Sequence, residues 1–314
     1  MFLNRIDDAS SPEDKALANS ISKIKNWQDM QITYERVNAG FTNFNYLVYI
    51  EELKLKCFAK VVGPGSEAFI DREVAHEAAV SAHEVGVGPE ILAYIKEDDF
   101  EVYEFLEGYK CFTISDMINP SLASKVMSCY AKVHSCDPLC RSNPWHKQIN
   151  DLKRQVIEKN ADMSPDLNYL IWHFNRAEKV LSMDDSELVP CYNDGYVTNY
   201  MKNEFGEVKI IDWEYGANND PYWDVATYFF ESFADKKTRL RLLKDYNPLA
   251  SESEIAKVEV FIPLICLKWG LWASLQSSIS QIKFDYLKYA DILFMRAKHL
   301  IDQEVWENSL SQFY

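Results

Sequence analysis

The sequence has no excess of positive charge. Its 314 residues include 33 Lys and Arg against 48 Asp and Glu, which gives a formal net charge of −15 at pH 7. Nucleic acids and anionic membranes are bound through basic patches, so neither is expected as a main partner of this chain. The acidity can serve solubility alone. It also suits the binding of a small cationic molecule.

The sequence also lacks a long apolar run and a regular pattern of cysteines. The longest apolar stretch, 260–267, contains Pro263 and is too short to span a bilayer. The first eight residues carry charges where a signal peptide has its apolar segment, so no export signal is expected. Seven cysteines are irregularly spaced, and Cys136 and Cys140 have no second Cys/His pair at zinc spacing. We therefore expect free thiols and a cytoplasmic location.

The composition indicates a globular protein, since 47% of the residues are apolar and 14% are aromatic. At this length the chain can form two lobes around a large core. Residues 1–108 are expected to form the first lobe. Alternating β-branched and aromatic residues over 31–62 predict antiparallel strands. Strands at 91–96 and 100–104 complete a five-stranded sheet, which is expected to pack with one helix at 67–85. A short amphipathic helix is expected before the sheet, at 13–30.

Beyond Gly108, a plausible hinge, the pattern becomes mostly helical. Residues 109–314 are expected to form the second lobe, in which short strands over 188–211 interrupt the helices. The predicted helices of this lobe are 120–135, 145–160, 165–182, 222–232, 235–246, 252–281 and 284–305. The expected fold class is therefore α+β, with a small antiparallel-sheet lobe followed by a larger helical lobe.

Three polar residues near the middle of the chain have the layout that phosphoryl transfer requires. Asp194 lies in a short turn before Gly195, Asn199 follows five residues later, and Asp212 ends an apolar strand. One carboxylate can accept the proton of an attacking hydroxyl, while an amide oxygen and a second carboxylate hold Mg²⁺ on the phosphates. Such a turn is often only a turn. A carboxylate ending a buried strand beside it is costly without a cation, which favours a kinase.

The segments around these residues resemble a known family. Residues 191–199 are similar to the His-x-Asp-x-x-x-x-Asn motif of the choline/ethanolamine kinases and aminoglycoside phosphotransferases, and residues 211–224 are similar to the family's metal-binding segment. The resemblance implies a bilobal protein-kinase-like fold with ATP between the lobes. The usual His of the motif is Tyr192 here. We expect this change to alter a packing contact rather than to abolish activity.

The resemblance also implies a role for each polar residue. Asp194 would be the catalytic base. Two residues, Asn199 and Asp212, would be ligands of Mg²⁺, and Glu214 would assist through a water molecule. ATP and Mg²⁺ are therefore the expected cofactors, and the acceptor would be a small molecule with a hydroxyl group.

The nucleotide end of the resemblance begins at residues 39–46, which are similar to the family's Gly-Gly-x-Thr/Ser-Asn phosphate loop with Ala in place of the first Gly. It implies phosphate contacts by Gly40, Thr42 and Asn43, because backbone N–H groups can approach phosphate oxygens in such a loop. Lys60, at the end of a predicted strand, would neutralise the α- and β-phosphates. The alternative is an edge-strand lysine that opposes aggregation.

In this family the lysine normally pairs with a Glu on the helix of the first lobe. The expected position holds Ala75. Glu73 and Glu77 lie two residues to either side, which is about 200° of rotation around a helix, so only one of them can face the cleft. We expect it to be Glu77. The segment 103–108 resembles the hinge whose backbone binds adenine, and two of its residues are assigned to that contact: Glu104 and Leu106.

The acceptor site is suggested by Trp269 and Trp272, which share a helix face. Two indoles on one face usually belong to a core. Here Gly270 thins the helix between them and the chain is acidic, and rings of this kind bind quaternary ammonium groups by cation–π attraction. The segment 269–289 is very similar to the choline-site helices of eukaryotic-type choline kinases. That similarity adds three residues to the expected site: Tyr215, Glu231 and Tyr289.

We therefore predict an ATP- and Mg²⁺-dependent choline kinase that makes phosphocholine. Ethanolamine kinase is the nearest alternative, although a primary ammonium prefers carboxylates and carbonyls to rings. A kinase for another small alcohol, such as an aminoglycoside, is a further alternative. A catalytically silent binding protein of the same fold is the alternative from another class. The sequence leaves open whether the protein is a monomer or a homodimer.

Overall fold

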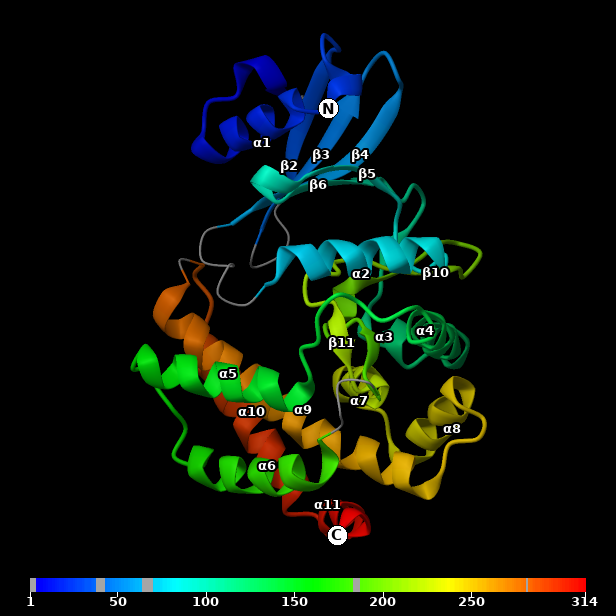
Figure 1. Ribbon diagram of the computed structural model, residues 1–314, viewed down its shortest axis with the longest axis vertical. Helices are drawn as coiled ribbons and strands as arrows, with labels where there is room; N and C mark the ends of the chain where they lie inside the picture. The colour runs from blue at the N-terminus through cyan, green and yellow to red at the C-terminus, as the bar shows by residue number, and fades with distance from the viewer. Residues whose placement is uncertain (1–3, 38–42, 64–69, 183–186, 281) are drawn as a thin grey trace.

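The computed structural model describes residues 4–37, 43–63, 70–182, 187–280 and 282–314. The molecule is elongated, with a sheet at the N-terminal end and helices toward the C-terminal end (Figure 1). Its buried apolar residues form two clusters. The smaller one includes Tyr46 and Val102 of the sheet, and the larger one includes Trp223 and Phe261 of the helices. This is the two-lobed α+β architecture that the sequence predicts.

Six antiparallel strands form the N-terminal sheet in the order β1-β2-β3-β4-β6-β5. Their bounds are β1 (Asn4–Arg5), β2 (Ile32–Val37), β3 (Asn43–Ile50), β4 (Leu55–Val62), β5 (Ile91–Ile95) and β6 (Phe100–Glu104). The prediction of five strands missed β1, whose two residues pair with β2. Along β4, Cys57, Ala59 and Val61 are buried, so Lys60 points to the opposite face of the sheet.

Two helices accompany this sheet. The first, α1 (Pro12–Ser22), begins at Ser11, whose side chain accepts a hydrogen bond from the Asp14 backbone N–H. The second, α2 (Arg72–Glu84), runs between the sheet and the larger lobe (Figure 1). The buried side of α2 is mostly alanine, and its small side chains let the larger lobe approach closely. A Cβ added at Gly216 would lie 2.4 Å from the Cβ of Ala78.

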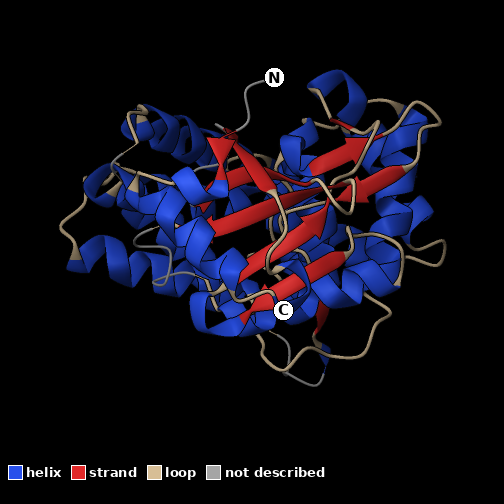
Figure 2. Ribbon diagram, turned by 90° about the horizontal axis from the view of Figure 1, so that it is seen from above, coloured by secondary structure: helices blue, strands red, loops and turns tan. Residues whose placement is uncertain are grey.

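The larger lobe is mostly helical, and two small sheets carry its polar segments. One sheet has the order β10-β9-β7, and the other pairs β11 with β8. Seen from above, along the long axis, the strands project onto the middle of the outline and helices surround them (Figure 2). The bounds are β7 (Lys110–Cys111), α3 (Ile114–Met117), α4 (Pro120–Val133), α5 (Trp145–Glu158), α6 (Leu167–Leu181), β8 (Val189–Cys191), β9 (Tyr200–Lys202), β10 (Val208–Ile210), β11 (Ala217–Asn219), α7 (Pro221–Ser232), α8 (Lys236–Tyr246), α9 (Glu252–Ile279), α10 (Tyr286–Ile301) and α11 (Glu304–Leu310).

Helix α9 runs through the centre of this lobe. Ser251 and Glu254 form a capping box at its N-terminus, and Pro263 lies within the helix. By length and composition α9 could cross a membrane, since its most apolar window has a mean hydropathy of 1.5. The apolar part of this helix is therefore longer than the run 260–267. However, 83% of that window is buried inside the protein, as in the core helix of a globular lobe. The predicted helix 284–305 is divided into α10 and α11.

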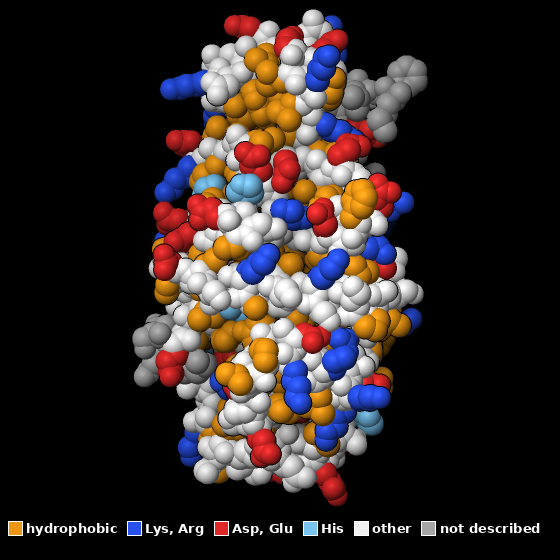
Figure 3. Space-filling model, turned by 90° about the vertical axis from the view of Figure 1, so that its right-hand side faces the viewer, with side chains coloured by type: hydrophobic (Ala, Val, Ile, Leu, Met, Phe, Trp, Pro, Cys, Tyr) orange, Lys and Arg blue, Asp and Glu red, His pale blue; other side chains and the backbone are white. Residues whose placement is uncertain are grey.

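The surface mixes charges of both signs. On the face shown in Figure 3, acidic and basic side chains are interspersed rather than gathered into one patch of a single sign. The net charge of −15 therefore does not appear there as one continuous acidic surface.

The contact between α9 and α10 depends on Gly270. A Cβ added there would lie 2.6 Å from a ring carbon of Phe294, which is 1% exposed. We predict that Gly270→Ala lowers the free energy of unfolding by about 1–3 kcal/mol, as overpacking does, despite the better helix propensity of alanine. Urea unfolding measures this change. Adding Phe294→Leu should recover part of the loss, whereas strictly additive effects would contradict the contact.

Candidate active site

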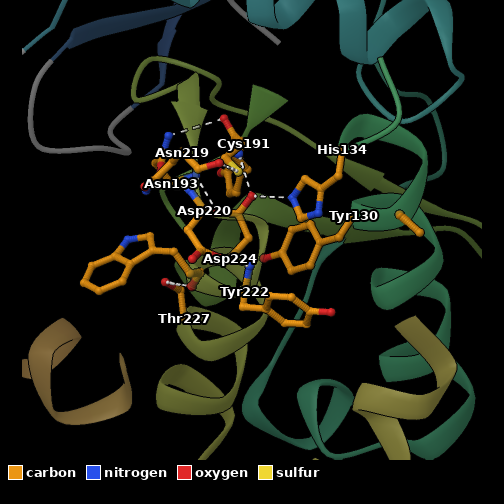
Figure 4. A network of polar contacts seen from close by, with 12 residues as sticks. Tyr130, His134, Cys191, Asn193, Asn219, Asp220, Tyr222, Asp224 and Thr227 are labelled. Atoms are coloured by element: carbon orange, nitrogen blue, oxygen red, sulfur yellow. Dashed lines mark hydrogen bonds and ion pairs between the residues drawn. The ribbon is translucent and has the colours of Figure 1, made fainter. Parts of the chain in front are cut away.

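A buried carboxylate holds the loop that contains the predicted base. Asp224, on α7, accepts hydrogen bonds from the backbone N–H groups of Tyr192 and Asn193, both at 2.7 Å. Its Oδ2 also lies 3.0 Å from Nε2 of His134, which follows α4 (Figure 4). The carboxylate is 1% exposed, so these contacts are not diluted by solvent. Asp224 thereby ties the loop to two helices.

The residue before the base is fixed as well. Asn193 has a φ of 64°, a conformation that Asn tolerates better than most residues. Its amide nitrogen donates to the carbonyls of Tyr215 and Ala217, at 3.0 and 3.2 Å, and its amide oxygen accepts a hydrogen bond from Asn219 at 2.7 Å. Gly195 follows the base, and a Cβ there would lie 2.7 Å from the Thr227 side chain. The direction of the Asp194 side chain is therefore set by the residues on either side of it.

The three residues of the phosphoryl-transfer layout come together. Asn199, at the end of a 3-10 turn, donates its amide N–H to Oδ2 of Asp194 at 3.0 Å. Asp212 lines the same cavity as these two residues, has a φ of 66° and forms an ion pair with Lys60. Burial raises the pKa of Asp194 well above its usual range, and the carboxylates of Asp212 and Glu214 raise it further.

This arrangement fits a hard divalent cation. Asn199, Asp212 and Glu214 offer oxygen atoms, the ligands that Mg²⁺ prefers. Several carboxylates in one partly buried site repel one another unless a cation lies among them. Glu214 is already held in place, since it accepts a hydrogen bond from Asn43 at 2.7 Å and lies 3.7 Å from Arg72. The donor set is therefore suited to Mg²⁺, which would lessen this repulsion.

A second group of potential metal ligands has a different role. His134, Cys191 and Asp224 place one ligand atom each within 4.8 Å of one another. Both oxygens of Asp224 already accept backbone hydrogen bonds, and Sγ of Cys191 lies 3.5 Å from the carbonyl of Asn219. Burial raises the pKa of the Cys191 thiol well above its ordinary value, which opposes the thiolate that a metal requires. We interpret this group as the support of the loop.

At the nucleotide end, Lys60, Glu104 and Leu106 line the same cavity as Asp194. The backbone N–H of Glu104 is already donated to the Glu90 carbonyl at 2.9 Å. Asn43 lies outside this cavity and contacts Glu214 instead. Two residues of the predicted phosphate loop, Gly40 and Thr42, lie outside the described residues.

The prediction that Glu77 pairs with Lys60 was wrong. Oε2 of Glu77 accepts a hydrogen bond from the backbone N–H of Cys140 at 2.8 Å, so this side chain is directed to the larger lobe. Glu73 is no substitute, because it contacts Lys96 and Arg141 at 3.1 and 3.0 Å. The α2 helix therefore gives Lys60 no carboxylate. Glu73 and Glu77 are both attracted by groups of the larger lobe, which helix geometry alone does not reveal.

The acceptor end of the cavity is lined by aromatic rings. The cavity has a volume of about 480 Å³ and extends from the hinge side chains past Asp194 to the predicted acceptor residues. The rings form a continuous series, each with a centroid 5.0–6.0 Å from the next. In order, they belong to Tyr215, Trp269, Trp272, Tyr286, Phe284 and Tyr289. The two indoles are only partly buried and are not sealed in the core.

The sequence analysis identified four of these six rings. Phe284 and Tyr286 were missed, although both lie in the segment that was compared with choline-site helices. Glu231 lines the same cavity, and its Oε1 accepts a hydrogen bond from the backbone N–H of Val197 at 3.1 Å. Burial raises the pKa of Glu231 above its usual range, which means that a bound cation would help to keep this carboxylate ionised.

Lys268 was also not predicted from the sequence. It is 3% exposed and donates to the carbonyl of Asn193 at 3.2 Å, directly before the predicted base. Its ammonium also lies 4.2 Å from the ring centroid of Trp269. Burial lowers the pKa of Lys268 to about 8, and the charge of Asp194 opposes that shift. The sequence did contain a signal for this residue, since a lysine within an apolar helical run is unusual.

Tyr192 occupies the position of the family's usual His. It is fully buried, and its hydroxyl donates to the carbonyl of Ile211 at 2.7 Å. Its ring also meets that of Trp213 edge-on, with centroids 4.8 Å apart. The phenol thereby links the loop of the base to the strand that leads to Asp212. That the exchange of the usual His for Tyr192 changes a packing contact without abolishing activity stays a prediction.

The fold and the site together define a phosphotransferase of the protein-kinase-like class. The model of the choline/ethanolamine kinase family matches residues 34–253, and the chain is a kinase that belongs to this family. It is 26% identical to ethanolamine kinase 2 of Rattus norvegicus over 315 residues, which cover 90% of this chain and 80% of that protein. The similarity to this relative therefore extends over most of both chains.

Solved structures share the fold. A choline/ethanolamine kinase family protein from Mesorhizobium loti superposes with a TM-score of 0.78 at 21% identity, over 93% of this chain and 96% of that one. The choline kinase LicA from Streptococcus pneumoniae superposes with a TM-score of 0.73 at 20% identity, over 96% of this chain and 100% of that one. The predicted bilobal protein-kinase-like fold is thus confirmed.

The buried ammonium of Lys268 predicts a specific pH dependence of stability. Its pKa is about 8 in the folded protein and 10.5 in a solvated chain, so between these values the unfolded state binds one proton more. Stability should therefore rise with pH relative to Lys268→Met, by up to about 3 kcal/mol from pH 8 to 10.5. Urea unfolding at several pH values measures the difference. Lys288→Met, at an exposed position, is the control and should give none; equal pH profiles for both variants would contradict the assignment.

Proposed function

We propose that this kinase uses ATP and Mg²⁺ to phosphorylate choline, which yields phosphocholine. The observation that carries the proposal is the composition of one cavity. Asp194 lies in it between the group formed by Lys60, Asn199 and Asp212 and the series of aromatic rings. A nucleotide phosphate and a cationic alcohol bound at the two ends would meet at this carboxylate.

The base acts on the hydroxyl of the acceptor. Asp194 accepts the proton as the oxygen attacks the γ-phosphate, the bond from the γ-phosphorus to the bridging oxygen breaks, and ADP leaves. The Asp194 side chain is held for this by Asn199 and by the fixed backbone of its loop. Burial raises the pKa of Asp194, and the charge of Lys268 opposes this rise and so favours the ionised form that a base requires. Positioning supplies much of the rate in such reactions, which suits a loop with this many constraints.

The nucleotide end neutralises phosphate charge. Asn199 and Asp212 would hold Mg²⁺, with Glu214 assisting through water, and the ion when bound offsets charge on the β- and γ-phosphates. Lys60 would contact the α- and β-phosphates, with adenine near Glu104 and Leu106.

The acceptor end favours choline over ethanolamine. Six rings line one end of the cavity, and aromatic rings attract a trimethylammonium group, which cannot donate hydrogen bonds. Glu231 adds negative charge to the same wall. A primary ammonium would make fewer favourable contacts with rings. Because the relatives include kinases named for both substrates, this preference is a proposal about the present cavity.

Location and partners follow from the same features. All seven cysteines are free, which suits a reducing cytoplasm. The acidic composition supports a small cationic acceptor rather than a nucleic acid or a membrane as partner.

Replacing the base tests the reaction. Asp194→Asn keeps the shape of the side chain but cannot accept the proton, so we expect kcat to fall by about 10³-fold or more. ATP–Mg²⁺ binding, measured by calorimetry, should change little. Asp291→Asn, which removes the same charge from an exposed site on α10, serves as the control and should keep full activity. If the wild type consumes no ATP with any of a panel of amino alcohols, the silent-binding alternative holds.

Removing one ring tests the acceptor. Trp269→Ala should raise the KM for choline about tenfold, since one cation–π contact with a desolvated ammonium is lost. The KM for ethanolamine should change much less. Trp172→Ala, at a residue that is 57% exposed on α6, provides a matched control. Steady-state kinetics with both acceptors gives the comparison, and equal effects on the two KM values would argue against a choline-binding set of rings.

A further inference from the structure

Lys60 faces a conflict between two cations. Within the described part of the chain, its one ion pair is with Asp212, which is also a proposed ligand of Mg²⁺. An ammonium and a divalent cation repel each other when they share a carboxylate at such short range. When Asp212 binds the metal, Lys60 therefore needs another anion to remain directed at the phosphates. The α2 helix does not provide one, since Ala75 stands at the expected position and Glu73 and Glu77 face elsewhere.

The neighbouring strand provides a carboxylate in its place. Glu101, on β6, is the register partner of Lys60 on β4, so the two side chains project from the same face of the sheet. Directly opposite residues of antiparallel strands have Cβ atoms about 4.5–5.5 Å apart. Both residues line a small cavity together with Ala75 and Tyr103. This is the space that a helix glutamate would otherwise fill.

Glu101 is also held in a fixed orientation. Its Oε1 lies 2.8 Å from Nδ1 of His76, on α2, and its Oε2 accepts a hydrogen bond from the hydroxyl of Tyr103. The ring of His76 stacks on that of Tyr94, with centroids 3.8 Å apart. These contacts join the strand to the α2 helix through His76. The carboxylate therefore connects the same elements that a glutamate on α2 would connect.

We propose that Glu101 is the positioning residue for Lys60, and that it replaces the missing glutamate of α2 when Asp212 engages the metal. The proposal rests on the proposed function, because it requires a nucleotide and Mg²⁺ at this site. Glu101 acts through the lysine and touches no reacting atom.

The test compares ligands that do and do not carry phosphates. We expect Glu101→Gln to weaken binding of ATP–Mg²⁺ about tenfold by calorimetry in the absence of acceptor, because Lys60 is no longer held toward the phosphates. Adenosine, measured by competition, should bind as it does to the wild type. Glu73→Gln is the matched control and should leave both affinities unchanged. Equal weakening of ATP and adenosine would indicate general damage to the lobe and overturn the proposal, as would unchanged ATP affinity.

A second experiment asks whether the effect passes through the lysine. Lys60→Met alone should weaken ATP–Mg²⁺ binding, and adding Glu101→Gln should then cause no further loss. Additive losses would show that Glu101 acts independently of Lys60, which contradicts its assignment. A wild type that binds no ATP–Mg²⁺ would remove the proposed function itself. If instead the wild type binds ATP–Mg²⁺ and the Glu101→Gln variant binds it equally well, only the role of Glu101 is rejected.

Discussion

The site depends on the mutual repulsion of carboxylates within one partly buried cleft. Asp194 lies close to the carboxylates of Asp212 and Glu214, and burial and these two charges together raise the pKa of Asp194, so its ionised form needs nearby positive charge. The protein supplies that charge from three separate elements, through Lys60 on β4, Arg72 on α2 and Lys268 on α9. Two of these contacts cross between the sheet lobe and the helical lobe. The ion pairs of Lys60 and Arg72 therefore both balance the charge of the site and hold the two lobes together.

A separate set of hydrogen bonds sets the positions at which these charges act. The backbone around Asp194 is held by Asp224, by the amide of Asn193 and by the Tyr192 hydroxyl, which reach α7, β11 and the Asp212 segment. Such over-determination allows residues with unusual backbone angles, as at Asn193 and Asp212, to persist. The cation partners can then exchange without displacement of the base. A loop held only by its charges would move whenever a metal or nucleotide arrived.

Much of this could be predicted from the sequence, and the exceptions have physical reasons. Period-two alternation along β4 fixed the side on which Lys60 lies, and the spacing of Asp194, Asn199 and Asp212 indicated their convergence. The partner of Lys60 could not be predicted, because Glu73 and Glu77 are attracted by groups that are distant in sequence. Four other residues were also not predicted: Lys268, Phe284, Tyr286 and Glu101. Their roles depend on the direction of a side chain on α9, on the path of a loop, or on which strand lies beside β4. No local periodicity encodes these directions.

Helix α9 places two different functions on adjacent residues. Lys268 reaches the loop of the base, and Trp269 begins the series of rings around the acceptor end. Since the lysine ammonium also contacts the indole, the ionisation of one end of the cavity and cation binding at the other are thermodynamically linked, each altering the other by the same factor. Evolution of a new acceptor preference at this helix turn would thus also change the strength of the base, which ties substrate range to the working pH of the enzyme.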